Sequence, residues 1–140
     1  MTHTGTNMKL MNREEKVQEF RRAAGKGSYD WLNEPGNTDL SVMASLEEEF
    51  NEFVEAEEIY RSACKHGHGI AEARANLCKE WADLQYVVSQ AAVYYEIPNE
   101  AFDRVHNSNM SKVVEGKVVF RADGKILKPD TYVAPDMSGL

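Results

Sequence analysis

Apolar residues recur along this chain with the spacing of amphipathic helices. In the segment from Asp39 to about Lys65 they repeat every three or four positions, which places them within one arc of about 100° on a helix. These residues are Met43, Leu46, Phe50, Phe53 and Val54. The segment from about Ile70 to Glu96 repeats the pattern with Leu77, Trp81, Leu84, Val88, Ala91 and Tyr95. We therefore expect two long helices joined by the short connector 66–69.

Two shorter helices are expected on either side of this pair. Asn12 followed by Glu15 resembles a capping box and predicts a helix over 13–24. Pro98 closes the second long helix, and the residues after it predict a further helix over 100–109.

The remaining segments carry turn signals. Residues 25–38 contain glycine and proline and are predicted to form a loop, in which we expect Trp31 to cover the core rather than to line a pocket. Short apolar runs at 118–120 and 125–127 flank Asp123-Gly124, which predicts a β-hairpin. Residues 129–140 are expected to be an irregular tail.

The fold class that follows is all-α. A chain of 140 residues has room for one hydrophobic core, so we expect a flexible N-terminus over 1–12 and a single domain over 13–140. If the two long helices pack antiparallel, the domain is a helical bundle with a small C-terminal β-hairpin.

Charge and hydropathy restrict the partners. The chain has 16 Lys and Arg against 23 Asp and Glu, a formal net charge of −7, and it lacks the basic stripe of a nucleic-acid-binding protein. Its longest apolar run, 91–95, is far below the roughly 20 residues that a membrane span needs. Residues 1–12 are polar and do not resemble a secretory signal. We therefore expect a cytoplasmic protein that binds neither nucleic acid nor membrane, with Cys64 and Cys78 as free thiols.

Two pairs of carboxylates carry the candidate chemistry. Glu49 and Glu52 are three residues apart on the first long helix, and Glu80 and Asp83 are three apart on the second. Residues at this spacing point the same way from neighbouring turns. If the helices pack antiparallel, the four side chains converge.

The position of these carboxylates relative to the core favours a metal. Glu80 projects inside the apolar arc of its helix, while Asp83 and Glu49 border the arcs. Buried carboxylates close together repel one another, which raises the pKa of some of them. We expect no Lys or Arg on these arcs to neutralise them, whereas Mg²⁺ or Mn²⁺ would. The alternative is that Glu80 and Asp83 only make helix–helix hydrogen bonds. A di-iron bundle would need two Glu-x-x-His motifs, which the sequence lacks.

At this point the sequence resembles a known superfamily. Glu48–Glu52 (EEFNE) followed by Glu80–Asp83 (EWAD) is similar to the EExxE…ExxD signature of the all-α nucleoside triphosphate pyrophosphohydrolases. Its compact MazG-like members, often encoded by phages and mobile elements, also resemble this chain elsewhere. The further similar segments are Ala82–Val88 (ADLQYVV), Val105–Lys112 (VHNSNMSK) and Arg121–Lys128 (RADGKILK). The resemblance covers about residues 13–136.

The resemblance implies roles at the matching positions. Glu49, Glu52, Glu80 and Asp83 would be the metal ligands and the catalytic residues, holding two or more Mg²⁺ ions, for which Mn²⁺ may substitute. Asn109 and Lys112 would bind the substrate phosphates. The superfamily is built of dimers or dimers of dimers, which implies a homodimer or a homotetramer.

The resemblance also implies an activity. It is the Mg-dependent hydrolysis of a (deoxy)nucleoside triphosphate to the monophosphate and pyrophosphate, which would clean or shape the nucleotide pool. The base and sugar stay open, with dGTP or GTP among the candidates, and a phage-encoded protein would act in the host cytoplasm. The alternatives are phosphoribosyl-ATP pyrophosphohydrolase activity and a non-catalytic helical interaction module. The four carboxylates argue against the module, because apolar residues would stabilise it better.

Overall fold

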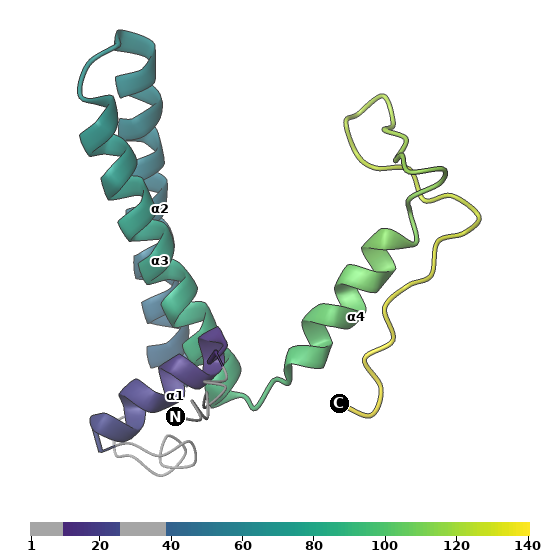
Figure 1. Ribbon diagram of the computed structural model, residues 1–140, viewed down its shortest axis with the longest axis horizontal. Helices are drawn as coiled ribbons and strands as arrows, with labels where there is room; N and C mark the ends of the chain where they lie inside the picture. The colour runs from purple at the N-terminus through teal and green to yellow at the C-terminus, as the bar shows by residue number, and fades with distance from the viewer. Residues whose placement is uncertain (1–9, 26–38) are drawn as a thin grey trace, which may run out of the picture. The chain divides into compact units, whose positions relative to one another are not determined.

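A computed structural model describes residues 10–25 and 39–140, and their fold is all-α, as predicted (Figure 1). The four helices are α1 (Arg13–Ala23), α2 (Asp39–His66), α3 (Ile70–Tyr94) and α4 (Asn99–Met110). Each boundary lies within two residues of the predicted one. Trp31 and most of the expected flexible N-terminus lie outside the described residues.

The chain divides into two compact units, Met1–Glu96 and Ile97–Leu140. The first contains α1, α2 and α3, and the second contains α4 and the segment that follows it. The single domain over 13–140 stays a prediction.

In the first unit, α2 and α3 form an antiparallel pair (Figure 1). The connector between them turns sharply because Gly67 and Gly69 both take a left-handed φ, of 67° and 68°. The amides of Gly67 and His68 donate to the carbonyl oxygen of Ala63, at 2.8 and 3.3 Å, and thus close the end of α2.

Helix α1 packs on α3 and begins as its sequence predicts. The side-chain oxygen of Asn12 accepts a hydrogen bond from the amide of Glu15 at 2.8 Å. Val17 is fully buried, and the rings of Phe20 and Tyr86 meet edge to face at 6.1 Å. Helix α3 therefore packs on both α1 and α2.

The buried core of the first unit is small. Its buried apolar residues are Val17, Val42, Ala56, Ala73, Val93 and Tyr94. Several large apolar residues of the same helices are exposed: Met43, Phe50, Val54, Ile59, Trp81 and Val88. The predicted apolar arcs are therefore only partly covered by the described residues of one chain.

The predicted β-hairpin does not form as a pair of strands. The described residues contain two isolated antiparallel bridges, Val114 to Lys117 and Phe120 to Ile126, and no strand. The turn itself lies where it was predicted, with Gly124 at a φ of 83°. The runs beside this turn are short and exposed, and two short strands with no packed face are not stable on their own.

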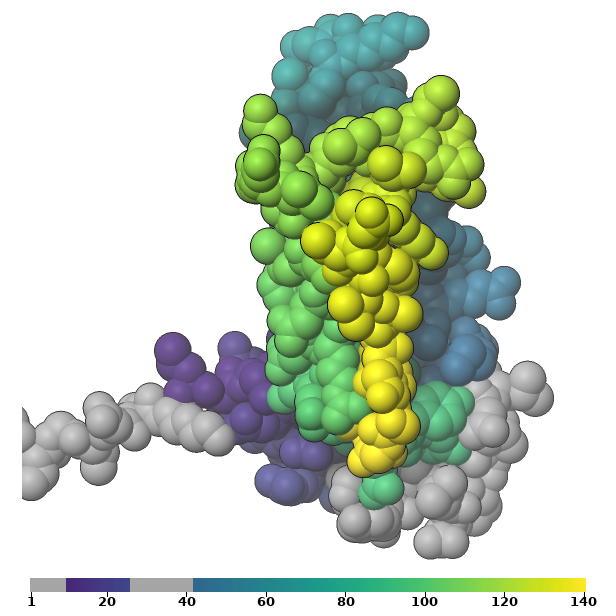
Figure 2. All heavy atoms as spheres, turned by 90° about the vertical axis from the view of Figure 1, so that its right-hand side faces the viewer, coloured from purple at the N-terminus to yellow at the C-terminus, as the bar shows by residue number. Residues whose placement is uncertain are grey.

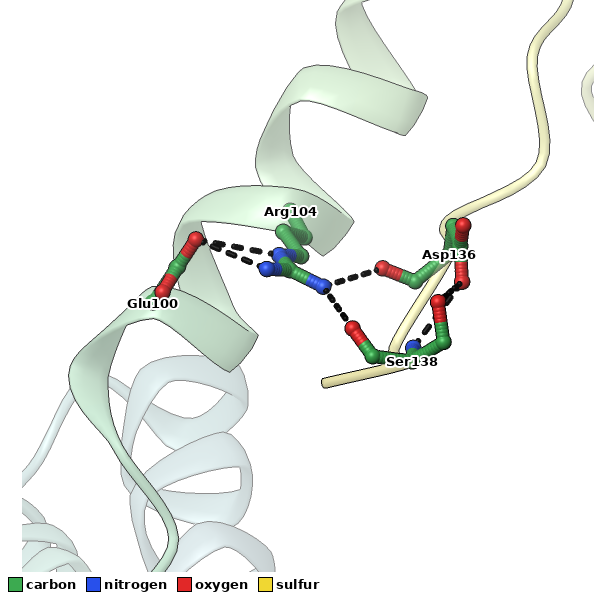
Figure 3. Close-up of polar contacts among 4 residues, drawn as sticks. All are labelled: Glu100, Arg104, Asp136 and Ser138. Atoms are coloured by element: carbon green, nitrogen blue, oxygen red, sulfur yellow. Dashed lines mark hydrogen bonds and ion pairs between the residues drawn. The ribbon is translucent and has the colours of Figure 1, made fainter. Parts of the chain in front are cut away.

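The C-terminal tail is irregular and runs along α4 (Figure 2). Arg104 fixes its end: its guanidinium donates to the carbonyl oxygens of Asp136 and Ser138, at 2.8 and 2.9 Å (Figure 3). The same guanidinium pairs with Glu100 at 2.8 Å, so its donors are shared between the helix and the tail. Within the described ranges, no helix is long and apolar enough to cross a membrane.

Candidate active site

Three of the predicted carboxylates meet between α2 and α3. Glu49 and Glu52 lie on successive turns of α2, and Glu80 faces them from α3. One oxygen atom from each of the three side chains lies within 4.8 Å of the other two. The i, i+3 spacing on α2 and the antiparallel pairing of the helices together produce this cluster.

The partial burial of this cluster fits a hard divalent cation: Glu52 is exposed, whereas Glu49 and Glu80 are half-buried. The Glu80 side chain is only 13% exposed. One oxygen of Glu49 and one of Glu80 are buried without a hydrogen-bond partner. A buried carboxylate oxygen without a partner costs free energy, and a divalent cation bound by oxygen ligands would remove that cost. The donor set, three carboxylates, is the one that Mg²⁺ and Mn²⁺ prefer.

The cluster also raises the pKa of one of its carboxyl groups. The pKa of Glu52 is raised above its ordinary value of 4.5, first by the charge of Glu49 and then by desolvation, a hydrogen bond with Glu80 and the charges of Glu80 and Glu48. A carboxyl that holds its proton more tightly is what the sequence led us to expect of crowded acids.

This shift predicts a pH dependence of stability for the metal-free protein. Since the pKa of Glu52 is higher in the folded than in the unfolded chain, the folded chain binds the proton more tightly. Stability should therefore fall as the pH rises through and above 4.5. Denaturant unfolding in EDTA between pH 4 and 7 (a range set about the ordinary glutamate pKa) should show a smaller fall in Glu52→Gln. Parallel curves for the two proteins would contradict this.

Asp83 and Lys79 correct part of the sequence analysis. The expectation that no cation neutralises these acids is wrong: the ammonium group of Lys79 lies 2.8 Å from Asp83 and 3.1 Å from Glu80. Hydrogen bonds to Asp83 and then to Glu80 raise the pKa of Lys79 above its ordinary range. Asp83 is 39% exposed and lies outside the cluster of three. Lys79 precedes Asp83 by four residues, a helical ion-pair spacing that sequence reasoning could have used.

The second predicted group, Asn109 and Lys112, lies at the end of α4. The ammonium group of Lys112 donates to the side-chain oxygen of Asn109 at 2.9 Å. The structure thus brings these two residues together, within the unit 97–140.

Comparison with known proteins gives one family. The sequence profile of the family described as phosphoribosyl-ATP pyrophosphohydrolase matches residues 13–109. The matched range includes all four predicted carboxylates and ends at Asn109, before Lys112. No curated protein matches the chain.

Proposed function

The chain belongs to the phosphoribosyl-ATP pyrophosphohydrolase family, and from this premise we propose that it is a Mg-dependent nucleoside triphosphate pyrophosphohydrolase. The family lies within the MazG-like all-α superfamily, so the resemblance is confirmed at that level. Membership makes the chain a hydrolase of phosphoric anhydride bonds, with nucleotide pyrophosphohydrolase activity in general. The observation that supports the metal-dependent form of this activity is the cluster of Glu49, Glu52 and Glu80 with its two unpartnered buried oxygens.

A nucleoside triphosphate is the substrate that we favour. The segments 105–112 and 121–128 resemble the compact MazG-like enzymes, and the second lies wholly beyond the matched range. The base and sugar are not selected by any residue described above, so dGTP, GTP and the other common nucleotides all stay candidates. We propose a role in shaping or cleaning the nucleotide pool of the cytoplasm, or of the host cytoplasm for a phage-encoded protein.

The metal would be held by Glu49, Glu52 and Glu80, with Asp83 joining them once it is released from Lys79. We propose two or more Mg²⁺ ions, for which Mn²⁺ can substitute. Bound Mg²⁺ supplies charge neutralisation for the phosphates and activation of the attacking water.

The chain's own residues then handle the proton and the substrate charge. The water oxygen bonds to a phosphorus of the nucleotide, the anhydride bond breaks, and the products are the monophosphate and pyrophosphate. Glu52 or Glu49 accepts the proton of the water. Asn109 and Lys112 bind the phosphates, Lys112 as a compact positive charge.

The experiment that tests this function is a panel of initial rates. Pyrophosphate release is measured from the common ribo- and deoxyribonucleoside triphosphates and from phosphoribosyl-ATP, at fixed Mg²⁺. Release from at least one triphosphate, faster than from phosphoribosyl-ATP, is the expected result. No release from any of them would favour the non-catalytic helical module.

Phosphoribosyl-ATP is the second candidate substrate, because the matched family is described by that activity. The two candidates share the same carboxylate cluster and the same bond cleavage. Faster pyrophosphate release from phosphoribosyl-ATP in the panel would therefore change the substrate that we assign, but not the reaction that we propose.

Lys112→Ala should slow hydrolysis without affecting the metal. Losing one charge-assisted contact costs roughly 1.5–3 kcal/mol, or on the order of 10- to 150-fold in kcat/KM. Mg²⁺ affinity of the free enzyme, measured by calorimetry, should change little, because Lys112 is not one of the clustered residues. Kinetics equal to wild type on every nucleotide would show that the lysine has no substrate role.

We also propose that the protein is a homodimer or a homotetramer. The large apolar side chains that α2 and α3 leave exposed, such as Phe50 and Ile59, would be covered by another copy. Light scattering at micromolar concentration should give at least twice the chain mass of 15.8 kDa. A mass equal to that of one chain would refute the proposal.

A further inference from the structure

Two lysines converge on one tyrosine in the unit 97–140. The ammonium nitrogen of Lys112 lies 5.7 Å from the centre of the Tyr132 ring, and that of Lys128 lies 5.0 Å from it. Neither lysine has a carboxylate at ion-pair distance in the part of the chain that the structure describes. Lys112 also donates a hydrogen bond to the side-chain oxygen of Asn109.

Tyr132 is held in place from both of its neighbours. The hydroxyl of Thr131 donates to the carbonyl oxygen of Ser111 at 2.9 Å. On the other side, the amide of Val133 donates to the hydroxyl oxygen of Ser111 at 2.9 Å, and the buried Ser108 hydroxyl donates to the Val133 carbonyl at 2.7 Å. Because Ser111 immediately precedes Lys112, the same anchor fixes the ring and one of the two cations.

This arrangement has no evident structural benefit without an anion. Tyr132 is only half-buried, so a cation over its ring gains little free energy, and two ammonium groups beside one ring repel each other. The chain has a net charge of −7, so carboxylates that could pair with the two lysines are abundant. The helix end accounts for Lys112, since cations are favoured there, but it does not account for Lys128, which follows 16 residues later in an irregular segment.

We propose that Lys128 binds the polyphosphate of the nucleotide together with Lys112, and that Tyr132 is the positioning residue for both. The inference rests on the proposed function and adds to it a second phosphate-binding lysine. Like Lys112, Lys128 lies beyond the residues that the family profile matches. An ammonium group has three donors, so each lysine can face the ring and still donate to phosphate oxygens. The chemical class of the ligand is a linear polyphosphate carrying several negative charges.

The first test measures binding in the absence of metal and of turnover. Inorganic tripolyphosphate is titrated into EDTA-treated protein by calorimetry. Lys128→Ala should weaken its affinity roughly tenfold or more, the loss typical of one charge-assisted contact. The matched control is Lys125→Ala, an exposed lysine of the same segment, which should stay within twofold of wild type. No binding by wild type, or an equal loss in both variants, would overturn the proposal.

The second test concerns Tyr132. Tyr132→Phe keeps the ring and should bind tripolyphosphate within twofold of wild type, whereas Tyr132→Leu removes it and should lose about as much affinity as Lys128→Ala. Lys128→Arg keeps the charge and should restore most of the affinity. Affinity in Tyr132→Leu equal to wild type would refute the positioning role.

The nucleotide panel separates this inference from the proposed function. In an enzyme that hydrolyses a triphosphate, Lys128→Ala should raise KM by the same factor as it weakens tripolyphosphate binding. If wild type hydrolyses no nucleotide and Lys128→Ala still has a lower affinity for tripolyphosphate, the proposed function fails and the phosphate-binding site is supported. If wild type hydrolyses a triphosphate and Lys128→Ala matches it in both binding and KM, the inference fails alone.

Discussion

Glu80→Gln is expected to abolish pyrophosphate release while leaving the metal-free protein folded and no less stable. Glu80 faces Glu49 and Glu52 from the other helix, and one of its oxygens is buried without a partner. A glutamine keeps the shape but removes one of three crowded negative charges, so repulsion in the empty site falls. Loss of an outer-shell partner of a metal typically costs about 10- to 100-fold, so the loss of a direct ligand should exceed roughly 100-fold.

Two measurements on the same samples check both parts of this expectation. Turnover is measured at saturating Mg²⁺, and thermal unfolding is followed by circular dichroism in EDTA. Glu55→Gln, the same change at an exposed position of α2, is the matched control and should keep wild-type turnover. Retained turnover in Glu80→Gln would remove it from the ligand set, and a lower melting temperature would mean that its charge stabilises the fold.

Removal of divalent cations is expected to have an effect of similar size. EDTA should eliminate turnover, and Mg²⁺ or Mn²⁺ should restore it. Because the cation would bind the folded chain and not the unfolded one, a concentration about 100 times Kd should stabilise the protein by roughly 2.7 kcal/mol. The two buried oxygens without partners are the physical source of this stabilisation.

Glu49→Ala tests whether the effect arises at the cluster. This variant should lose the Mg²⁺-dependent increase in melting temperature together with its turnover. Lys112→Ala should keep the full increase, since it lies outside the cluster. Stabilisation of Glu49→Ala by Mg²⁺ to the wild-type extent would place the metal elsewhere.

The helices were predictable because their signals are local. Asn12 caps α1, and the glycines after His66 end α2, as their sequence indicates. The predicted end of α3 at 96 is two residues too far, because Glu96 takes a left-handed φ of 54° before Pro98 is reached. The β-hairpin was predicted wrongly because its strands depend on contacts that are not local. Its turn is a local feature and is present, but strands also need a packed face, which a pattern of five or six residues cannot predict.

The carboxylate cluster was predictable only in part. The i, i+3 spacing predicts that Glu49 and Glu52 share a face, and the antiparallel packing then brings Glu80 to them. Asp83 has the same spacing from Glu80 but pairs with Lys79, since its side chain is partly exposed to solvent and a cation four residues earlier can reach it. Tyr132 carried no signal, and Lys128 appeared only as the last residue of the similar segment 121–128. Their proximity to Lys112 was not predictable, because it depends on an irregular segment folding back on α4.

The way in which the tail is attached has a consequence for its evolution. Arg104 and Ser108 donate to main-chain carbonyls of the tail, and Ser111 accepts from a main-chain amide. Main-chain atoms are the same whichever side chains the tail carries. The tail can therefore accumulate substitutions without losing its attachment. Drift should be faster at the tail positions other than Tyr132 than at these three positions of α4 and its C-terminal cap.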